Sequence, residues 1–157
     1  MLTSRCVLLA LLGCLAGCAS VPTGPGFSVV ECPPDMAVVY VYRLHTPPVM
    51  LKPDIKVRDV AVAALPTDSY TVLRLKPGTY AIKTDWGFLN NPPLSKTAIL
   101  SVEAGISYYV NFAGKLGIRG TTATYGAQVI IGEATTIPPE LTTCTYVAPN
   151  VPMPDPQ

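Results

Sequence analysis

The sequence has few charged residues and almost no net charge. Asp, Glu, Lys and Arg make up 13% of the 157 residues, and the formal net charge at pH 7 is +1. Nucleic-acid binding requires a clustered basic surface, and attachment to anionic lipid by charge alone requires one as well. The balance of ten acidic and eleven basic residues therefore argues against both kinds of partner.

The chain also lacks the residue groupings that catalysis and metal binding need. Its only histidine, His45, has no accompanying serine or cysteine motif, so an ordinary surface role is the better interpretation. The carboxylates Asp54, Asp59, Asp68 and Asp85 show no spacing that singles out a catalytic pair. No CxxC or Cys/His spacing predicts a metal site. We therefore expect no catalytic residue, metal or cofactor.

No apolar run is long enough to cross a bilayer as a helix. The longest, residues 6–15, has about ten residues where a spanning helix needs about 20. Arg5 precedes it and small residues follow, which is the layout of a secretory signal peptide. Residues 15–18, Leu-Ala-Gly-Cys, match the lipobox of bacterial lipoproteins, in which the cut falls between Gly17 and Cys18. We expect residues 1–17 to be removed and Cys18 to be lipidated; an ordinary signal peptide cut near Ala19 is the alternative.

The expected lipid determines the expected location. In lipoproteins the cysteine thiol carries a diacylglycerol and the new amino terminus is usually acylated, and two or three chains anchor durably. By resemblance to lipoproteins of diderm bacteria, aspartate after the cysteine would favour the inner membrane, and this chain has Ala19 there. We expect attachment to the outer membrane, facing the periplasm.

Two cysteines, Cys32 and Cys144, remain besides Cys18 once the signal is gone. The periplasm is oxidising, which favours a bond between them. Closing a loop of about a hundred residues would stabilise by about 4–5 kcal/mol in the chain-entropy model. Two unpaired thiols, or a bond to another protein, are the alternatives.

The remaining pattern predicts a β-domain over residues 36–147. Helical periodicity is poor, while β-branched and aromatic residues cluster in short runs separated by Pro, Gly and Asn. Arg58-Asp59, Pro77-Gly78 and Ala104-Gly105 provide turns, and residues 114–126 are expected to form a loop. The expected fold is a single antiparallel β-sandwich of about seven strands. The expected strands are residues 36–43, 55–57, 60–65, 70–75, 79–86, 97–103, 106–112 and 127–132, with a last short run around Tyr146.

Proline-rich segments flank this domain. Residues 18–35 are predicted to be the lipidated cysteine and a flexible tether, and residues 148–157 a disordered tail. Within the domain, strand alternation places Tyr109 opposite the inward-facing Tyr108. An exposed tyrosine on a sheet is a candidate for partner contact, so Tyr109 is the predicted contact residue.

Three stretches carry a family resemblance: AVVYVYR at 37–43, LRLKPGTYAIKTDW at 73–86 and LSVEAGISYYVNF at 100–112. Together they resemble a family of small bacterial lipoproteins of unknown function with a transthyretin-like β-sandwich, over roughly residues 36–132. The family usually has an Asp-Gly or Asn-Gly turn where this chain has Val57-Arg58-Asp59-Val60. The resemblance implies an envelope lipoprotein without an established activity, and it supplies no catalytic residues.

The leading hypothesis is a non-enzymatic, lipid-anchored module that interacts with an envelope protein or assembly. A small-ligand or glycan-binding module on the same anchor is the alternative, and a cell-wall hydrolase is a weaker one. A pocket with convergent polar groups would favour the ligand module, and an open sheet edge would favour a protein partner. Clustered carboxylates of raised pKa around Asp54 and Asp59 would favour the enzyme.

Overall fold

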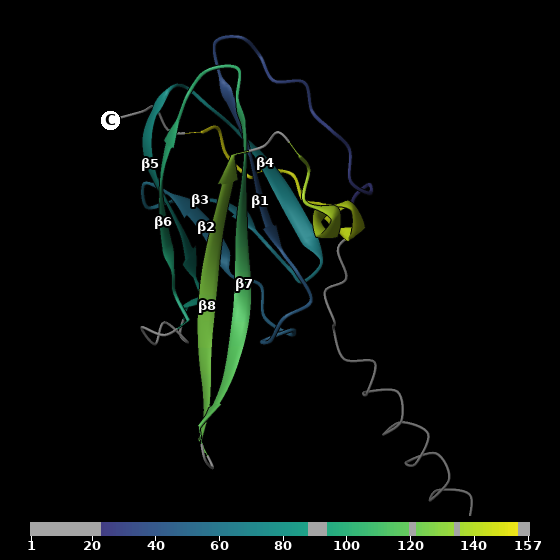
Figure 1. Ribbon diagram of the computed structural model, residues 1–157, viewed down its shortest axis with the longest axis vertical. Coiled ribbons are helices and arrows are strands. Elements are labelled where there is room, and N and C mark those ends of the chain that lie inside the picture. The colour runs from purple at the N-terminus through teal and green to yellow at the C-terminus, as the bar shows by residue number, and fades with distance from the viewer. Residues whose placement is uncertain (1–22, 88–93, 120–121, 134–135, 154–157) are drawn as a thin grey trace, which may run out of the picture.

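The computed structural model describes residues 23–87, 94–119, 122–133 and 136–153, and their strands pack as two sheets face to face (Figure 1). The first sheet has the order β8-β7-β1-β4-β9 and the second the order β3-β2-β5-β6. The predicted all-β sandwich is confirmed. Its elements are β1 (Ala37–Arg43), β2 (Asp54–Val57), β3 (Val60–Ala64), β4 (Ser69–Leu75), β5 (Gly78–Asp85), β6 (Thr97–Val102), β7 (Ser107–Arg119), β8 (Thr122–Glu133), the 3-10 helix η2 (Pro139–Thr143) and β9 (Thr145–Tyr146).

The first sheet is mixed, whereas an antiparallel sandwich was expected. β1 pairs antiparallel with β4 and parallel with β7, and β4 pairs parallel with β9. After β4 the chain crosses to the second sheet for β5 and β6, so β7 returns beside β1 in the same direction. Parallel neighbours need such a long crossover, and an alternating sequence pattern identifies strands without identifying their partners.

The β7–β8 hairpin extends past the rest of the sandwich as a two-stranded arm (Figure 1). The two strands pair from Tyr108↔Glu133 to Arg119↔Thr122, but β1 accompanies β7 only as far as Asn111. Most of the predicted loop at 114–126 therefore belongs to strands. Its glycines and threonines weaken the local strand signal, and pairing with a facing strand outweighs that local preference.

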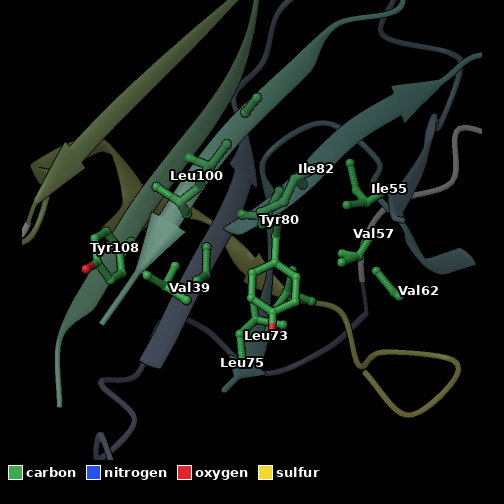
Figure 2. Packing of buried hydrophobic residues seen from close by; sticks show 14 of the residues in the cluster. Val39, Ile55, Val57, Val62, Leu73, Leu75, Tyr80, Ile82, Leu100 and Tyr108 are labelled. Atoms are coloured by element: carbon green, nitrogen blue, oxygen red, sulfur yellow. The ribbon is translucent and has the colours of Figure 1, made fainter. Parts of the chain in front are cut away.

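The core lies between the sheets. β5 and β6 alternate strictly, and Tyr80, Ile82, Ala98, Leu100 and Val102 are buried. Figure 2 shows Tyr80 directed toward Leu73 and Leu75 of the facing sheet, within one buried cluster. One face of β5 is therefore packed into the inter-sheet core.

Two of the predicted turns form where expected, while Pro77-Gly78 makes a bend that carries the chain from β4 in the first sheet to β5 in the second. Arg58 and Asp59 have φ of 52° and 67°, the left-handed geometry that suits a tight hairpin between β2 and β3. Gly105, with φ of 75°, turns the chain between β6 and β7. Lys83 on β5 forms an ion pair with Asp59 at the hairpin tip, which helps to hold this turn against the neighbouring strand.

Candidate functional site at the outer face of the first sheet

An aromatic cluster lies on the face of the first sheet that points away from the core. Tyr40 of β1, Tyr70 of β4 and Tyr109 of β7 are each less than 8% exposed. The Tyr40 ring stacks on the Tyr109 ring with centroids 5.2 Å apart and lies 6.3 Å from the Tyr70 ring. All seven residues of β1 are buried, so this strand is covered on both faces.

Residues 24–32, which we call the strap, cover this cluster. The Phe27 ring lies 5.9 Å from the Tyr40 ring and 5.4 Å from the Tyr70 ring. The Tyr70 hydroxyl accepts a hydrogen bond from the Ser28 amide at 3.1 Å, and the Tyr40 hydroxyl accepts one from the Val30 amide at 2.8 Å. The segment expected to be a free tether is therefore docked from residue 24 onward.

The strap is also joined to the end of the domain. The Pro25 carbonyl accepts the Tyr146 amide at 2.8 Å, and Gly26 forms an isolated β-bridge with Thr145. A Cβ at Gly24 would lie 1.9 Å from the Tyr146 carbonyl oxygen, so a larger residue there would force the two segments apart. The strap and the β9 segment near the end of the domain thus stabilise each other's position.

The segment after β9 is docked as well, in contrast to the predicted disordered tail. The Val147 amide donates to the Tyr70 carbonyl, and the Asn150 amide donates to the Val62 carbonyl of the other sheet. Met153 packs against the inter-sheet core. The tail therefore closes one side of the sandwich as far as residue 153, and residues 154–157 lie outside the described part.

Tyr109, the predicted contact residue, is not exposed. It is 7% exposed and stacks on Tyr40, and burial raises the pKa of its hydroxyl above the ordinary value. Strand alternation correctly places Tyr109 and Tyr108 on opposite faces of the sheet, and Tyr108 faces the core. The prediction failed because strand periodicity gives the side of the sheet and not whether another segment covers that side.

The predicted disulfide between Cys32 and Cys144 is not formed, and both thiols are free. The Cys32 sulfur lies 3.5 Å from the Met36 carbonyl, at the start of β1. Cys144 precedes Thr145, whose amide donates to Asp68 beside the end of β1. The length of β1, about 20 Å, separates these ends, and a disulfide needs Cα atoms within about 7 Å.

We expect the two thiols to differ in reactivity. Cys144 is 1% exposed, and burial raises its pKa to about 11. With little thiolate at pH 8, Cys144 is expected to react with iodoacetamide at least about a hundredfold more slowly than a free thiol, while the partly exposed Cys32 reacts readily. Peptide mapping by mass spectrometry measures both rates, and urea provides the control in which both react. A Cys32–Cys144 peptide in an unreduced digest would contradict the structure.

A cavity of about 280 Å³ opens between the strap and β4. The strap forms one wall, β4 the floor and β9 one end. Arg74 is exposed, while Tyr70 and Val72, at alternate positions of the same strand, are buried. No sequence pattern indicates this cavity, because residues 18–35 read as a free tether. The lining residues are Pro25, Ser28, Val30, Tyr70, Val72, Arg74 and Tyr146.

Arg43, at the end of β1, is a buried cation that alternation did not single out. Its guanidinium is buried and donates to four backbone carbonyls at 2.6–3.3 Å, and it lies 5.0 Å from the centre of the Trp86 ring. These contacts hold the β1–β2 connection, so Arg43 has a structural role. The acceptors are the carbonyls of Thr46, Pro48, Leu51 and Leu65.

The residues considered for catalysis are dispersed. His45 is at the surface as predicted, and its Nδ1 lies 2.7 Å from an Asp68 carboxylate oxygen. The hydrogen bond from Lys83 lowers the pKa of Asp59, the reverse of what a general acid there would need. In the described residues no His, Cys, Asp and Glu side chains gather into a group that could hold a metal ion.

The predicted cleavage and lipidation residues, Gly17 and Cys18, lie outside the described residues. Among the described helices, none has the length and apolar character to span a membrane.

Searches of curated proteins and of solved structures found no match to this chain. The family model described as "Protein of unknown function (DUF2846)" matches residues 33–127. The match begins just after the strap, ends within β8 and covers more than half of the chain. The chain therefore belongs to the DUF2846 family of proteins of unknown function.

Proposed function

We propose that the protein is a non-enzymatic lipoprotein that binds a protein partner in the bacterial envelope. In this proposal the signal is cut between Gly17 and Cys18, and Cys18 carries the lipid that anchors the domain in the outer membrane, facing the periplasm. The lipobox-like sequence supports the anchor. The strand order supports the further proposal that the sandwich is transthyretin-like.

The β7–β8 arm is the observation that favours a protein partner. Its pairs from Phe112↔Val129 to Arg119↔Thr122 have no third strand beside them in the described residues. Each strand of the arm thus has an edge of unpaired backbone amides and carbonyls. Such edges bind an extended segment by adding a strand, which is a common mode of protein recognition.

The other two hypotheses receive unequal support. A cell-wall hydrolase would need a pair of carboxylates with separated pKa values, and Asp59 instead forms an ion pair with Lys83. A ligand-binding module is favoured by one observation, the cavity beside the strap, and is the second candidate.

The test combines the anchor and the arm in one experiment in cells. A photo-crosslinking amino acid in place of Thr124, on the arm, is expected to give a discrete protein adduct in the membrane fraction. In the same chain Cys18→Ser is expected to move most of the protein to the soluble fraction and to abolish fatty-acid incorporation, because it removes the anchoring thiol.

The matched control places the crosslinker at Thr79, which is exposed on the outer face of the second sheet. Adducts of the same partner at both positions would argue against a specific arm contact. A Cys18→Ser chain that stays in the membrane fraction, together with wild type that takes up no fatty-acid probe, would reject the lipid anchor.

A further inference from the structure

The docked strap leaves a short link to the proposed anchor. Gly24 already packs against Tyr146, and Cys18 lies six residues earlier. Six residues reach at most about 20 Å when fully extended, whereas a free tether from Cys18 to residue 35 would reach about 60 Å. The strap side of the sandwich is thus held near the bilayer surface if Cys18 carries the lipid.

The cavity lies on this same side. Pro25, the residue after Gly24, is part of its lining, and Ser28 and Val30 continue the same wall. Val29, between them, is 67% exposed, so an apolar side chain projects outward from the strap next to the cavity. An exposed valine is better accommodated at a bilayer interface than in water.

The lining combines one cation with apolar and aromatic surface. Arg74 is the only charged residue among those that line the cavity, and the ion pairs found in the described residues do not include it. Val72 and Tyr70, on the same face of β4 as Arg74, line it as well, together with Val30 of the strap. A guanidinium binds phosphate with paired hydrogen bonds, and valine and tyrosine suit the glycerol and first acyl carbons beside that phosphate.

We propose that this cavity binds the phosphate-bearing headgroup of a phospholipid in the membrane that holds the anchor. This inference rests on the proposed lipid anchor at Cys18. The diacylglycerol expected on Cys18 has no phosphate, so the bound molecule is a separate membrane lipid. Arg74 contacts the phosphate, and the volume of about 280 Å³ accommodates the headgroup and leaves most of the acyl chains in the bilayer.

The first test is a titration that does not depend on lipidation. The chain from residue 18 with Cys18→Ser is titrated with dihexanoylphosphatidylglycerol and followed by amide NMR. We expect saturable shifts at Ser28, Val30 and Arg74. Arg74→Gln is expected to weaken binding at least about tenfold, because a charged hydrogen bond is lost, and Arg74→Lys by less. Lys52→Gln, an exposed control in another loop, should leave the affinity unchanged.

Two further probes separate the sources of binding. Inorganic phosphate tests the anion alone, and octyl glucoside tests an acyl chain with a neutral headgroup. Both are expected to bind at least about tenfold more weakly than the phospholipid, because each supplies only part of the contact surface. Equal binding of inorganic phosphate would overturn the lipid source, equal binding of octyl glucoside would overturn phosphate recognition, and no shifts with any probe would overturn the site.

The second test uses the lipidated protein in membranes. A photo-crosslinker at Val29, 67% exposed, is expected to form phospholipid adducts, whereas one at Ile99, 63% exposed on the outer face of the other sheet, is not. Lipidated protein without adducts at residue 29 would overturn the inference and leave the anchor intact. Wild type that takes up no fatty-acid probe would instead reject the anchor, and the titration would still decide whether the cavity binds lipid.

Discussion

Replacing Arg43 with alanine is expected to lower the free energy of unfolding by about 3–5 kcal/mol, because several buried carbonyls lose their charged hydrogen-bond donor. Arg43 is 2% exposed and its guanidinium donates to four carbonyls, among them those of Leu51 and Pro48 at 2.7 and 2.6 Å. Without it these carbonyls lose a charged donor, and the Trp86 ring loses the cation that lies over it. Urea denaturation of the purified domain measures the change.

Two variants make this result specific. Arg43→Lys retains the charge but lacks the planar set of guanidinium N–H donors. It is therefore expected to lower the free energy of unfolding by about half as much as Arg43→Ala. Arg74→Ala removes an exposed arginine from the neighbouring strand and should change the free energy of unfolding by less than about 0.5 kcal/mol. If Arg43→Ala and Arg74→Ala cost the same, the carbonyl contacts of Arg43 do not stabilise the fold as the structure indicates.

Replacing Tyr70 with alanine is expected to cost about 3–5 kcal/mol and to release the strap, because a large buried ring is lost. Tyr70 is 1% exposed, and its ring lies 5.4 Å from the Phe27 ring and 5.5 Å from the Tyr146 ring. Its hydroxyl also accepts the Ser28 amide. Tyr70→Phe keeps the ring and should cost only about 1 kcal/mol. Urea denaturation gives the free energies, and hydrogen exchange at Ser28 and Val30 reports the strap.

The control for strap release is Leu73→Ala. Leu73 is fully buried on the opposite face of β4, in the inter-sheet core, so this change is expected to cost about 2–5 kcal/mol without contacting the strap. Under native conditions the strap amides should then exchange faster in Tyr70→Ala than in Leu73→Ala. Equal exchange in the two variants would mean that the strap is held independently of Tyr70.

The sandwich and most of its strands follow from local pattern. Tyr80 and Ile82 stand at alternate positions of β5, so their side chains share one face of the strand. That face is buried in the inter-sheet core. The Arg58-Asp59 hairpin formed without the Asp-Gly or Asn-Gly signature, because a non-glycine residue tolerates positive φ at a modest cost that strand pairing offsets. These features depend on residues adjacent in the chain, which is why they were predictable.

The candidate site was not predictable in this way. The composition of residues 24–32 is that of a linker, and nothing local indicates that Phe27 lies against Tyr40 and Tyr70. The contacts that dock the strap join residues 42 positions apart, as between Ser28 and Tyr70. The predictions that Tyr109 is exposed and that Cys32 bonds to Cys144 fail for the same reason. Whether a side chain is covered, and whether two cysteines are close, depends on how distant segments pack.

Local residue patterns indicate the fold class, the strand alternation and the hairpin turns, and residues 15–18 supply the lipobox-like sequence on which the proposed anchor rests. Each of these features depends on residues adjacent in the chain, through side-chain periodicity, turn geometry or a short motif. Long-range packing, in contrast, makes β1 and β7 parallel, places the strap over the outer face of the first sheet, and puts Arg74 at the cavity beside the strap. These features arise from pairing and burial between segments far apart in the chain, where a local pattern carries no information about the partner.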